Sequence, residues 1–180
     1  VLNIGGCSQI SDGAIGFAIS GLSALQQLHL PSTMVAESSM FHIASSKGAS
    51  LLQTLDLSDC QHVNDGLIIP LLKACSSLKS LSLSGNRNIT DESASALPPN
   101  VQRLFLDHCP GITDRSIVVL ASRCVRLSDL DLRSNSSVSD TGLNVLLEGA
   151  TNLERLDIRG CAVSGALTER IKKQVGPIVE

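Results

Sequence analysis

The stretch VQRLFLDHCPGITDRSIVVLASRC, residues 101–124, holds the pattern that decides the fold of this chain. Aliphatic residues stand at its first, fourth and sixth positions, and a cysteine stands at its ninth. The same pattern begins again at Leu25, Leu52, Leu78, Leu127 and Leu153, and the end of one more copy begins at Leu2. The ninth position falls at residues 7, 33, 60, 86, 109, 135 and 161, so the copies are 23 to 27 residues apart. A period of this length predicts a solenoid, in which each repeat stacks only on its neighbours.

Each repeat is expected to contain one short strand and one helix. The alternation Leu-x-Leu, as at Leu104 and Leu106, is typical of a short parallel strand. Apolar residues at helical spacing follow it, as in DGLIIPLLKAC, DRSIVVLASRC and DTGLNVLLEGA. An aspartate preceded by Ser, Thr or Asn recurs at one offset: Asp12, Asp65, Asp91, Asp114 and Asp140. We interpret this column as helix starts rather than catalytic acids, because the preceding residue can cap free N–H groups and the aspartate favours the positive helix end.

The six cysteines follow the same columns. Four occupy the ninth position of a repeat, where other repeats have asparagine or threonine: Cys7, Cys60, Cys109 and Cys161. The other two, Cys75 and Cys124, lie at helix ends, where other repeats have Leu22 and Ala150. Since these positions exchange with residues that bind no metal, and since the sequence has no C-x-x-C or H-x-x-x-H pair, a zinc site is disfavoured. We expect structural, reduced thiols, with no metal and no cofactor.

Composition limits the classes of partner. The chain has 43% hydrophobic and 17% charged residues, with three Phe and neither Trp nor Tyr, so aliphatic side chains must fill the core. Its formal net charge of −3 provides no long-range attraction for nucleic acid. No apolar run reaches the roughly 20 residues that cross a bilayer. We therefore expect neither nucleic acid nor a membrane as partner. The first residues already have the pattern of a strand and no Met precedes them, so we interpret the chain as a fragment of a longer one.

The columns resemble the cysteine-containing class of leucine-rich repeat, whose consensus reads Leu-x-x-Leu-x-Leu-x-x-Cys-x-x-Ile-Thr-Asp-x-Gly-Leu. The resemblance covers nearly the whole chain and implies an α/β fold, a curved leucine-rich repeat solenoid with parallel strands on the concave face and helices on the convex face. We expect one domain over residues 1–180 with about seven repeats, the first incomplete. The last repeat is degenerate, and Leu167, Ile171 and Val175 are spaced so that a helix can lie over the final layer as a C-terminal cap.

The resemblance also implies protein binding rather than catalysis. Many proteins of this class are F-box proteins, substrate receptors of cullin-RING ubiquitin ligases, in which the repeats bind the substrate and a separate N-terminal F-box binds the ligase adaptor. We expect the substrate-recognition part of such a receptor, with the adaptor bound through a missing N-terminal region. The alternative is a structural subunit of a large assembly, such as a ciliary or axonemal regulatory complex or a DNA-repair complex. The expected location is the cytoplasm or nucleus, where thiols stay reduced, with the cilium as an alternative.

The candidate binding residues lie beside the central leucine of each strand and just after the strand, where they should line the concave face. In the last three repeats they are Arg103, Phe105, Asp107, Asp129, Asp131, Arg133, Arg155, Asp157 and Arg159. An outward Phe among Arg and Asp side chains has the composition of a protein-binding hot spot. The alternative interpretation is that mixed charges solvate this face and Phe105 is a tolerated exposed side chain. No phosphate-binding Gly loop or GxSxG elbow accompanies the acids, so we expect no enzymatic activity.

Overall fold

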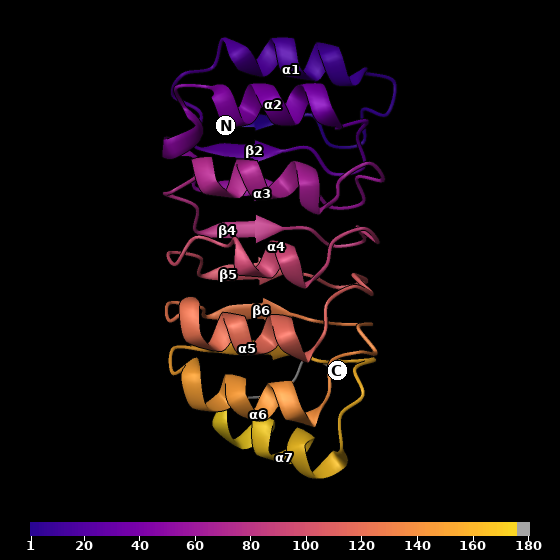
Figure 1. The fold of residues 1–180 in the computed structure, drawn as a ribbon, viewed down its shortest axis with the longest axis vertical. Helices are drawn as coiled ribbons and strands as arrows, with labels where there is room; N and C mark the ends of the chain where they lie inside the picture. The colour runs from indigo at the N-terminus through magenta and orange to yellow at the C-terminus, as the bar shows by residue number, and fades with distance from the viewer. Residues whose placement is uncertain (176–180) are drawn as a thin grey trace.

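Seven short parallel strands form one sheet in the computed structural model, which describes residues 1–175 (Figure 1). Each strand pairs with the next strand in the chain, and the central leucines pair with one another, as Leu55 does with Leu81. The strands are β1 (Leu2–Asn3), β2 (Gln27–His29), β3 (Thr54–Asp56), β4 (Ser80–Ser82), β5 (Arg103–Phe105), β6 (Asp129–Asp131) and β7 (Arg155–Asp157). The repeat pattern therefore predicted both the strands and their register.

One helix follows each strand, and the helices form a second layer on one side of the sheet (Figure 1). They are α1 (Asp12–Ser20), α2 (Glu37–Ser45), α3 (Asp65–Ala74), α4 (Asp91–Ser95), α5 (Asp114–Arg123), α6 (Asp140–Gly149) and α7 (Gly165–Gln174), with a 3₁₀ helix, η1 (Ala49–Leu51), before β3. None of the helices within residues 1–175 is long and apolar enough to span a membrane. The two-layer α/β solenoid confirms the predicted fold class.

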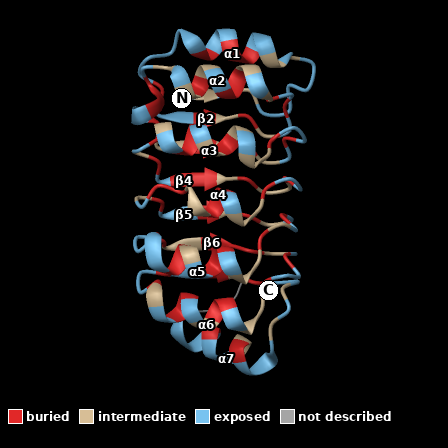
Figure 2. Cartoon of the chain, viewed as in Figure 1, coloured by how far each residue is buried: buried red, intermediate tan, exposed pale blue. Residues whose placement is uncertain are grey.

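Aliphatic side chains fill the space between the two layers. The central leucine of each strand from β2 to β7 is buried, as are the inward residues of the helices, for example Ile117 and Leu120 of α5. Figure 2 shows buried segments alternating with exposed ones along the helices. None of the three Phe side chains lies in this core. Phe17 and Phe41 are exposed on the helices, and Phe105 is half-buried on the opposite side of the sheet. The core is therefore made of thin aliphatic layers, as the composition indicates.

From the third repeat on, the ninth position binds the repeat before it. The Cys109 thiol donates a hydrogen bond to the Leu83 carbonyl oxygen at 3.1 Å, and the Asn135 amide nitrogen donates to the Leu106 carbonyl oxygen at 2.8 Å. Cysteine and asparagine can exchange in this column because both side chains make the same contact with the preceding strand end. All six thiols are free, and Cys7 is exposed because it lies in the first repeat, at the edge of the array.

The aspartate column has a second role that the sequence pattern did not predict. The predicted caps are confirmed, since the Thr113 hydroxyl accepts a hydrogen bond from the Arg115 N–H at 3.1 Å at the start of α5. In addition, Asp91 at the start of α4 reaches the next repeat, where its carboxylate accepts hydrogen bonds from the Thr113 N–H at 3.0 Å and hydroxyl at 2.8 Å. It also accepts from the N–H and hydroxyl of Ser116. Each aspartate thus links two successive helix starts.

Helix α2 shows the effect of this link most clearly, because its repeat has no aspartate in the column and no capping side chain at Ala36. Asp12 of the preceding repeat accepts hydrogen bonds from the N–H groups of Ala36 at 2.8 Å, Ser38 at 2.8 Å and Ser39 at 3.0 Å. These are N–H groups that a helix cannot satisfy internally. The carboxylate of one repeat therefore caps the helix of the next.

Two repeats differ from the others in their helices. Helix α4 has five residues, half the length of α3, and it ends before the segment LPPN. Helix α7 buries Leu167 and Ile171, and its C-cap residue Val175 packs against the core, so these residues cover the last layer. The remainder of the predicted domain, residues 176–180, lies outside the described part of the chain.

The aspartate links predict a loss of stability in acid. Burial opposes ionisation of Asp12, Asp65 and Asp91, but hydrogen bonds from hydroxyl and N–H groups outweigh it and lower the pKa of each carboxyl group below its usual value. A carboxyl group whose pKa is lower in the folded than in the unfolded chain stabilises the fold at pH values above its unfolded pKa of about 4. This stabilisation is lost as the pH falls through the folded pKa. We expect urea midpoints to fall steeply below about pH 4. A midpoint that is unchanged between pH 7 and pH 3 would contradict this role.

Candidate functional site

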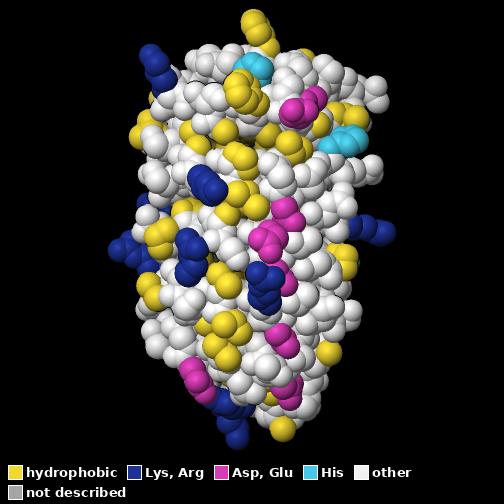
Figure 3. All heavy atoms as spheres, in the orientation of Figure 1, with side chains coloured by type: hydrophobic (Ala, Val, Ile, Leu, Met, Phe, Trp, Pro, Cys, Tyr) yellow, Lys and Arg dark blue, Asp and Glu magenta, His cyan; other side chains and the backbone are white. Residues whose placement is uncertain are grey.

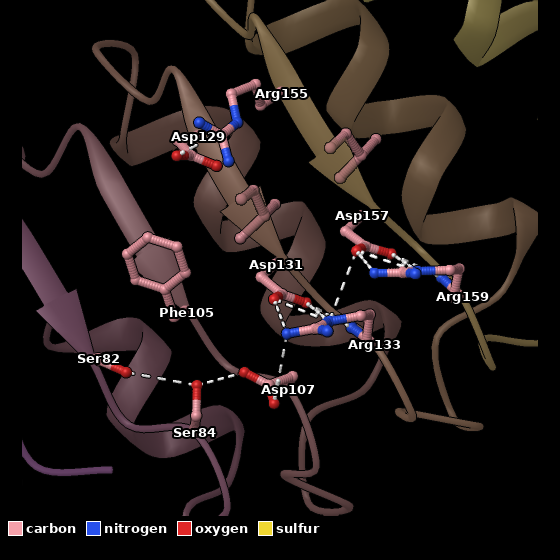
Figure 4. Close-up of a pocket in the computed structure, with 12 residues that line it drawn as sticks. Ser82, Ser84, Phe105, Asp107, Asp129, Asp131, Arg133, Arg155, Asp157 and Arg159 are labelled. Atoms are coloured by element: carbon pink, nitrogen blue, oxygen red, sulfur yellow. Dashed lines mark hydrogen bonds and ion pairs between the residues drawn. The ribbon is translucent and has the colours of Figure 1, made fainter. Parts of the chain in front are cut away.

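The face of the sheet away from the helices, here called the strand face, has a hollow of about 420 Å³ over β4 to β7 (Figure 4). Eight of the nine residues predicted to bind a partner line it; Arg103 is exposed beside it. The lining residues are Ser82, Ser84, Phe105, Asp107, Asp129, Leu130, Asp131, Arg133, Arg155, Leu156, Asp157 and Arg159. The strand pattern therefore predicted which residues would lie together, although not that they would surround a hollow.

Strand geometry places these side chains. In β5 the central Leu104 is buried toward the helices, so its neighbours Arg103 and Phe105 lie on the strand face. The register then aligns equivalent positions across the sheet: Phe105 pairs with Asp131, and Asp131 pairs with Asp157. These three side chains form one row across β5, β6 and β7. The residues that follow each strand form a second row beside it.

Arg133 lies at the centre of the charged part of the hollow, surrounded by three carboxylates (Figure 4). Its Nε donates to both oxygens of Asp131, at 3.0 and 2.9 Å, and its Nη2 lies 2.6 Å from Asp131 Oδ2. Oxygens of Asp157 and Asp107 lie 3.5 and 3.8 Å from the same guanidinium. Contacts on three sides hold this side chain in one orientation.

The other two arginines of the hollow are held to different degrees. Arg159 binds Asp157 at close range, with Nε donating to Oδ1 at 3.0 Å and Nη2 donating to Oδ2 at 2.6 Å. The Nε of Arg155 lies 3.6 Å from Asp129 Oδ2, which is an ion pair without a hydrogen bond. The Arg155 side chain is 70% exposed, the highest value among these arginines. It is therefore the arginine of the hollow with the most freedom to bind a partner.

Asp131 lies on the strand face, as the strand pattern predicts, but its side chain is covered. The residue is only 8% exposed, because the guanidinium of Arg133 covers its carboxylate. Its geometry is that of a positioning residue, which accepts hydrogen bonds from the side chain and the backbone N–H of Arg133. The strand pattern indicates which face a side chain occupies, but it does not indicate that a longer neighbour will cover it.

Charge states in the hollow follow from these contacts. Burial opposes ionisation of Asp107, but hydrogen bonds from Ser84 and His108 and the positive charge of Arg133 lower its pKa below the usual range. The hydrogen bond to Asp131 raises the pKa of Arg133 above its usual value. Both groups therefore stay charged at neutral pH. Asp107 and Arg133 therefore present fixed charges of opposite sign in this part of the hollow.

Serine hydroxyl groups extend the polar network beyond the predicted residues. Ser84 donates a hydrogen bond to Asp107, Ser82 donates to Ser84 at 3.3 Å, and the hydroxyl groups of Ser58 and Ser82 are 2.6 Å apart. Ser58 in turn donates to Asp56 at 2.6 Å. The candidate binding residues named from the sequence did not include these serines. The sequence could have identified them, because they occupy the same two rows of repeat positions as the charged residues.

Phe105 forms an apolar wall of the hollow beside the aspartates (Figure 4). The other two Phe residues lie on the helix side of the molecule, where Phe17 is 81% and Phe41 is 67% exposed. The helix side, seen in Figure 3, carries exposed hydrophobic side chains mainly over α1 to α3 and charged side chains mainly over α4 to α6. Phe105 is therefore the aromatic side chain that combines an apolar surface with fixed charges around it.

Comparison with known proteins agrees with this architecture. A family model described as Leucine Rich repeat matches residues 74–97, which run from the end of α3 to just after α4. A solved structure of internalin C2 from Listeria monocytogenes str. 4b F2365 is similar to this chain, with a TM-score of 0.71 and 22% sequence identity over 99% of this chain and 68% of the internalin chain. The chain has the leucine-rich repeat fold. No curated protein matches the sequence.

The leucine-rich repeat fold is typical of non-enzymatic scaffolds that bind other proteins. Within residues 1–175, no three His, Cys, Asp or Glu side chains come together as a set that could hold a metal ion. Burial raises the pKa of the Cys75 and Cys109 thiols to about 12, so these thiols are protonated at neutral pH and are poor nucleophiles. The chemistry that the array offers at its strand face is hydrogen bonding, ion pairing and contact with Phe105.

Proposed function

We propose that the leucine-rich repeat array binds a protein partner through the strand face over β4 to β7. The observation that carries this proposal is the hollow, which combines a half-buried aromatic wall with guanidinium groups held by neighbouring carboxylates. Aromatic and arginine side chains supply a large share of binding energy in protein interfaces. Groups that are already held in one orientation lose little conformational entropy when a partner binds.

The finer proposal is that the array is the substrate-recognition part of an F-box-type ubiquitin ligase receptor in the cytoplasm or nucleus. Its support is the cysteine-containing repeat pattern described above. The free thiols of the array are consistent with a reducing compartment. Purification of the full-length protein from cells tests this proposal. A cullin adaptor that copurifies in stoichiometric amounts would support it, whereas copurification with axonemes and no adaptor would favour the structural-subunit alternative.

Two phenylalanine variants test the binding face itself. Phe105→Ala is expected to weaken partner binding by about 2 kcal/mol, or roughly 30-fold, because it removes an anchor that the interface desolvates. Phe41→Ala is the matched control, since it removes an equally large side chain that is 67% exposed on the helix side. The measurement is a quantitative pull-down from cell extract, followed by affinity measurement with the recovered partner, using variants with equal thermal midpoints.

Other outcomes of this experiment would contradict the proposed binding face. If Phe41→Ala releases the partner while Phe105→Ala retains it, the helix side is the binding face. If both variants retain the full set of partners, the anchor role of Phe105 is wrong.

A further inference from the structure

The charges of the hollow are arranged in two levels. The side chains of its four aspartates are only 12% to 16% exposed, whereas those of its three arginines are 38% to 70% exposed. The carboxylates therefore lie beneath and the guanidinium groups lie above them. Although acids outnumber bases among the lining residues, the groups that a partner meets first are cationic.

The guanidinium groups also keep unused hydrogen-bond donors. Each guanidinium has five N–H donors, and the contacts of Arg133 and Arg159 within the described chain use Nε and Nη2. Neither Nη1 group makes a hydrogen bond with a described residue, and the same is true of both Nη groups of Arg155. Arg103, which pairs with Asp129 in the strand register, is exposed and makes no side-chain contact of this kind with residues 1–175.

We propose that the hollow recognises an acidic segment of its protein partner, whose Asp or Glu side chains bind the outer guanidinium groups while a neighbouring apolar side chain packs on Phe105. This inference rests on the proposed function and specifies the chemistry of the partner. Guanidinium groups suit carboxylates because two parallel N–H groups can bind two oxygens. The buried aspartates hold the arginines in place, so the partner does not have to order them.

A basic partner fits this surface less well. Its ammonium or guanidinium groups would have to reach carboxylates that lie beneath the arginines. Three of these carboxylates already accept hydrogen bonds from Arg133, Arg159 or Ser84, and the fourth, Asp129, forms an ion pair with Arg155. Breaking such a contact leaves a partly buried charge without its partner, which is costly.

Selection from a random peptide library, with the intact 180-residue chain as bait, tests the inference without assuming a partner. Enriched peptides are expected to carry net negative charge and at least one large apolar residue. We expect Arg155→Gln to weaken binding of the enriched peptides about tenfold, which corresponds to about 1.4 kcal/mol. Arg126→Gln is the matched control, because it removes the same charge from an exposed position outside the hollow and should change affinity less than about twofold.

Several results would overturn the inference. They are enrichment of neutral or basic peptides, no enrichment at all, and equal effects of Arg155→Gln and Arg126→Gln. A phosphoserine version of an enriched peptide that binds more than about tenfold tighter would assign the site to phosphate rather than carboxylate. A single-stranded RNA that binds as tightly, with the same dependence on Arg155, would assign it to nucleic acid. The inference can fail in any of these ways while the loss of partner binding in Phe105→Ala still supports the proposed function.

Discussion

Replacing Leu106 by alanine is expected to lower the free energy of unfolding by about 2–5 kcal/mol. The side chain is 2% exposed and fills the third aliphatic position of its repeat. The Leu106 side chain lies beside Leu83 and Ile112 in the core, so alanine would leave a cavity there. Because each repeat is stabilised mainly by its neighbours, a weakened layer between β4 and β6 affects the array on both sides. Urea unfolding followed by circular dichroism measures the change.

Cys109→Asn is the control for this prediction. Asn135 already fills the same column and donates to the Leu106 carbonyl, just as Cys109 donates to the Leu83 carbonyl. We expect this variant to cost less than about 1 kcal/mol, because the amide can keep the contact with the preceding strand. An equal loss of stability in the two variants would show that the thiol has a role beyond this hydrogen bond.

Replacing Asp91 by alanine is expected to lower the free energy of unfolding by about 2–4 kcal/mol. This is more than the small effect that is usual for a polar residue at the surface. Its carboxylate accepts four hydrogen bonds from the N–H and hydroxyl groups of Thr113 and Ser116. Ser116 is fully buried, so its polar groups have no water to replace the lost acceptor. The same urea experiment measures the change, and circular dichroism should show loss of helix.

Asp140→Ala provides the comparison. Asp140 occupies the same column but accepts from the Ser164 N–H, at 2.8 Å, on an exposed part of the last repeat. Water can satisfy the Ser164 N–H there, so the effect should be clearly smaller than that of Asp91→Ala. Equal effects would mean that the aspartates act only through the charge at their own helix starts and not through the link to the next repeat.

The candidate site was predicted in part from the sequence. Alternation along a strand assigns Phe105 to the face opposite Leu104, and the repeat brings the equivalent residues of neighbouring strands into one row. The pattern did not show that Asp131 would be covered by Arg133, or that Ser82 and Ser84 would continue the network. These features depend on which of several rotamers a long side chain adopts and on its neighbours in the next strand.

The sequence by itself determined the solenoid, the register of its strands and the starts of five helices, because each of these follows from a short pattern that recurs along the chain. Only the tertiary structure decided how the layers are joined. Asp91 accepts hydrogen bonds from the following repeat. Asp59 and His108 adopt a left-handed backbone, with φ of 55° and 56°, at a position where other repeats have glycine. Their N–H groups bind carbonyl oxygens of the next repeat, at 2.8 Å for Asp59 and 2.9 Å for His108, and these bonds help hold the turn. Such contacts join residues about 25 positions apart, and they exist only once two repeats have stacked.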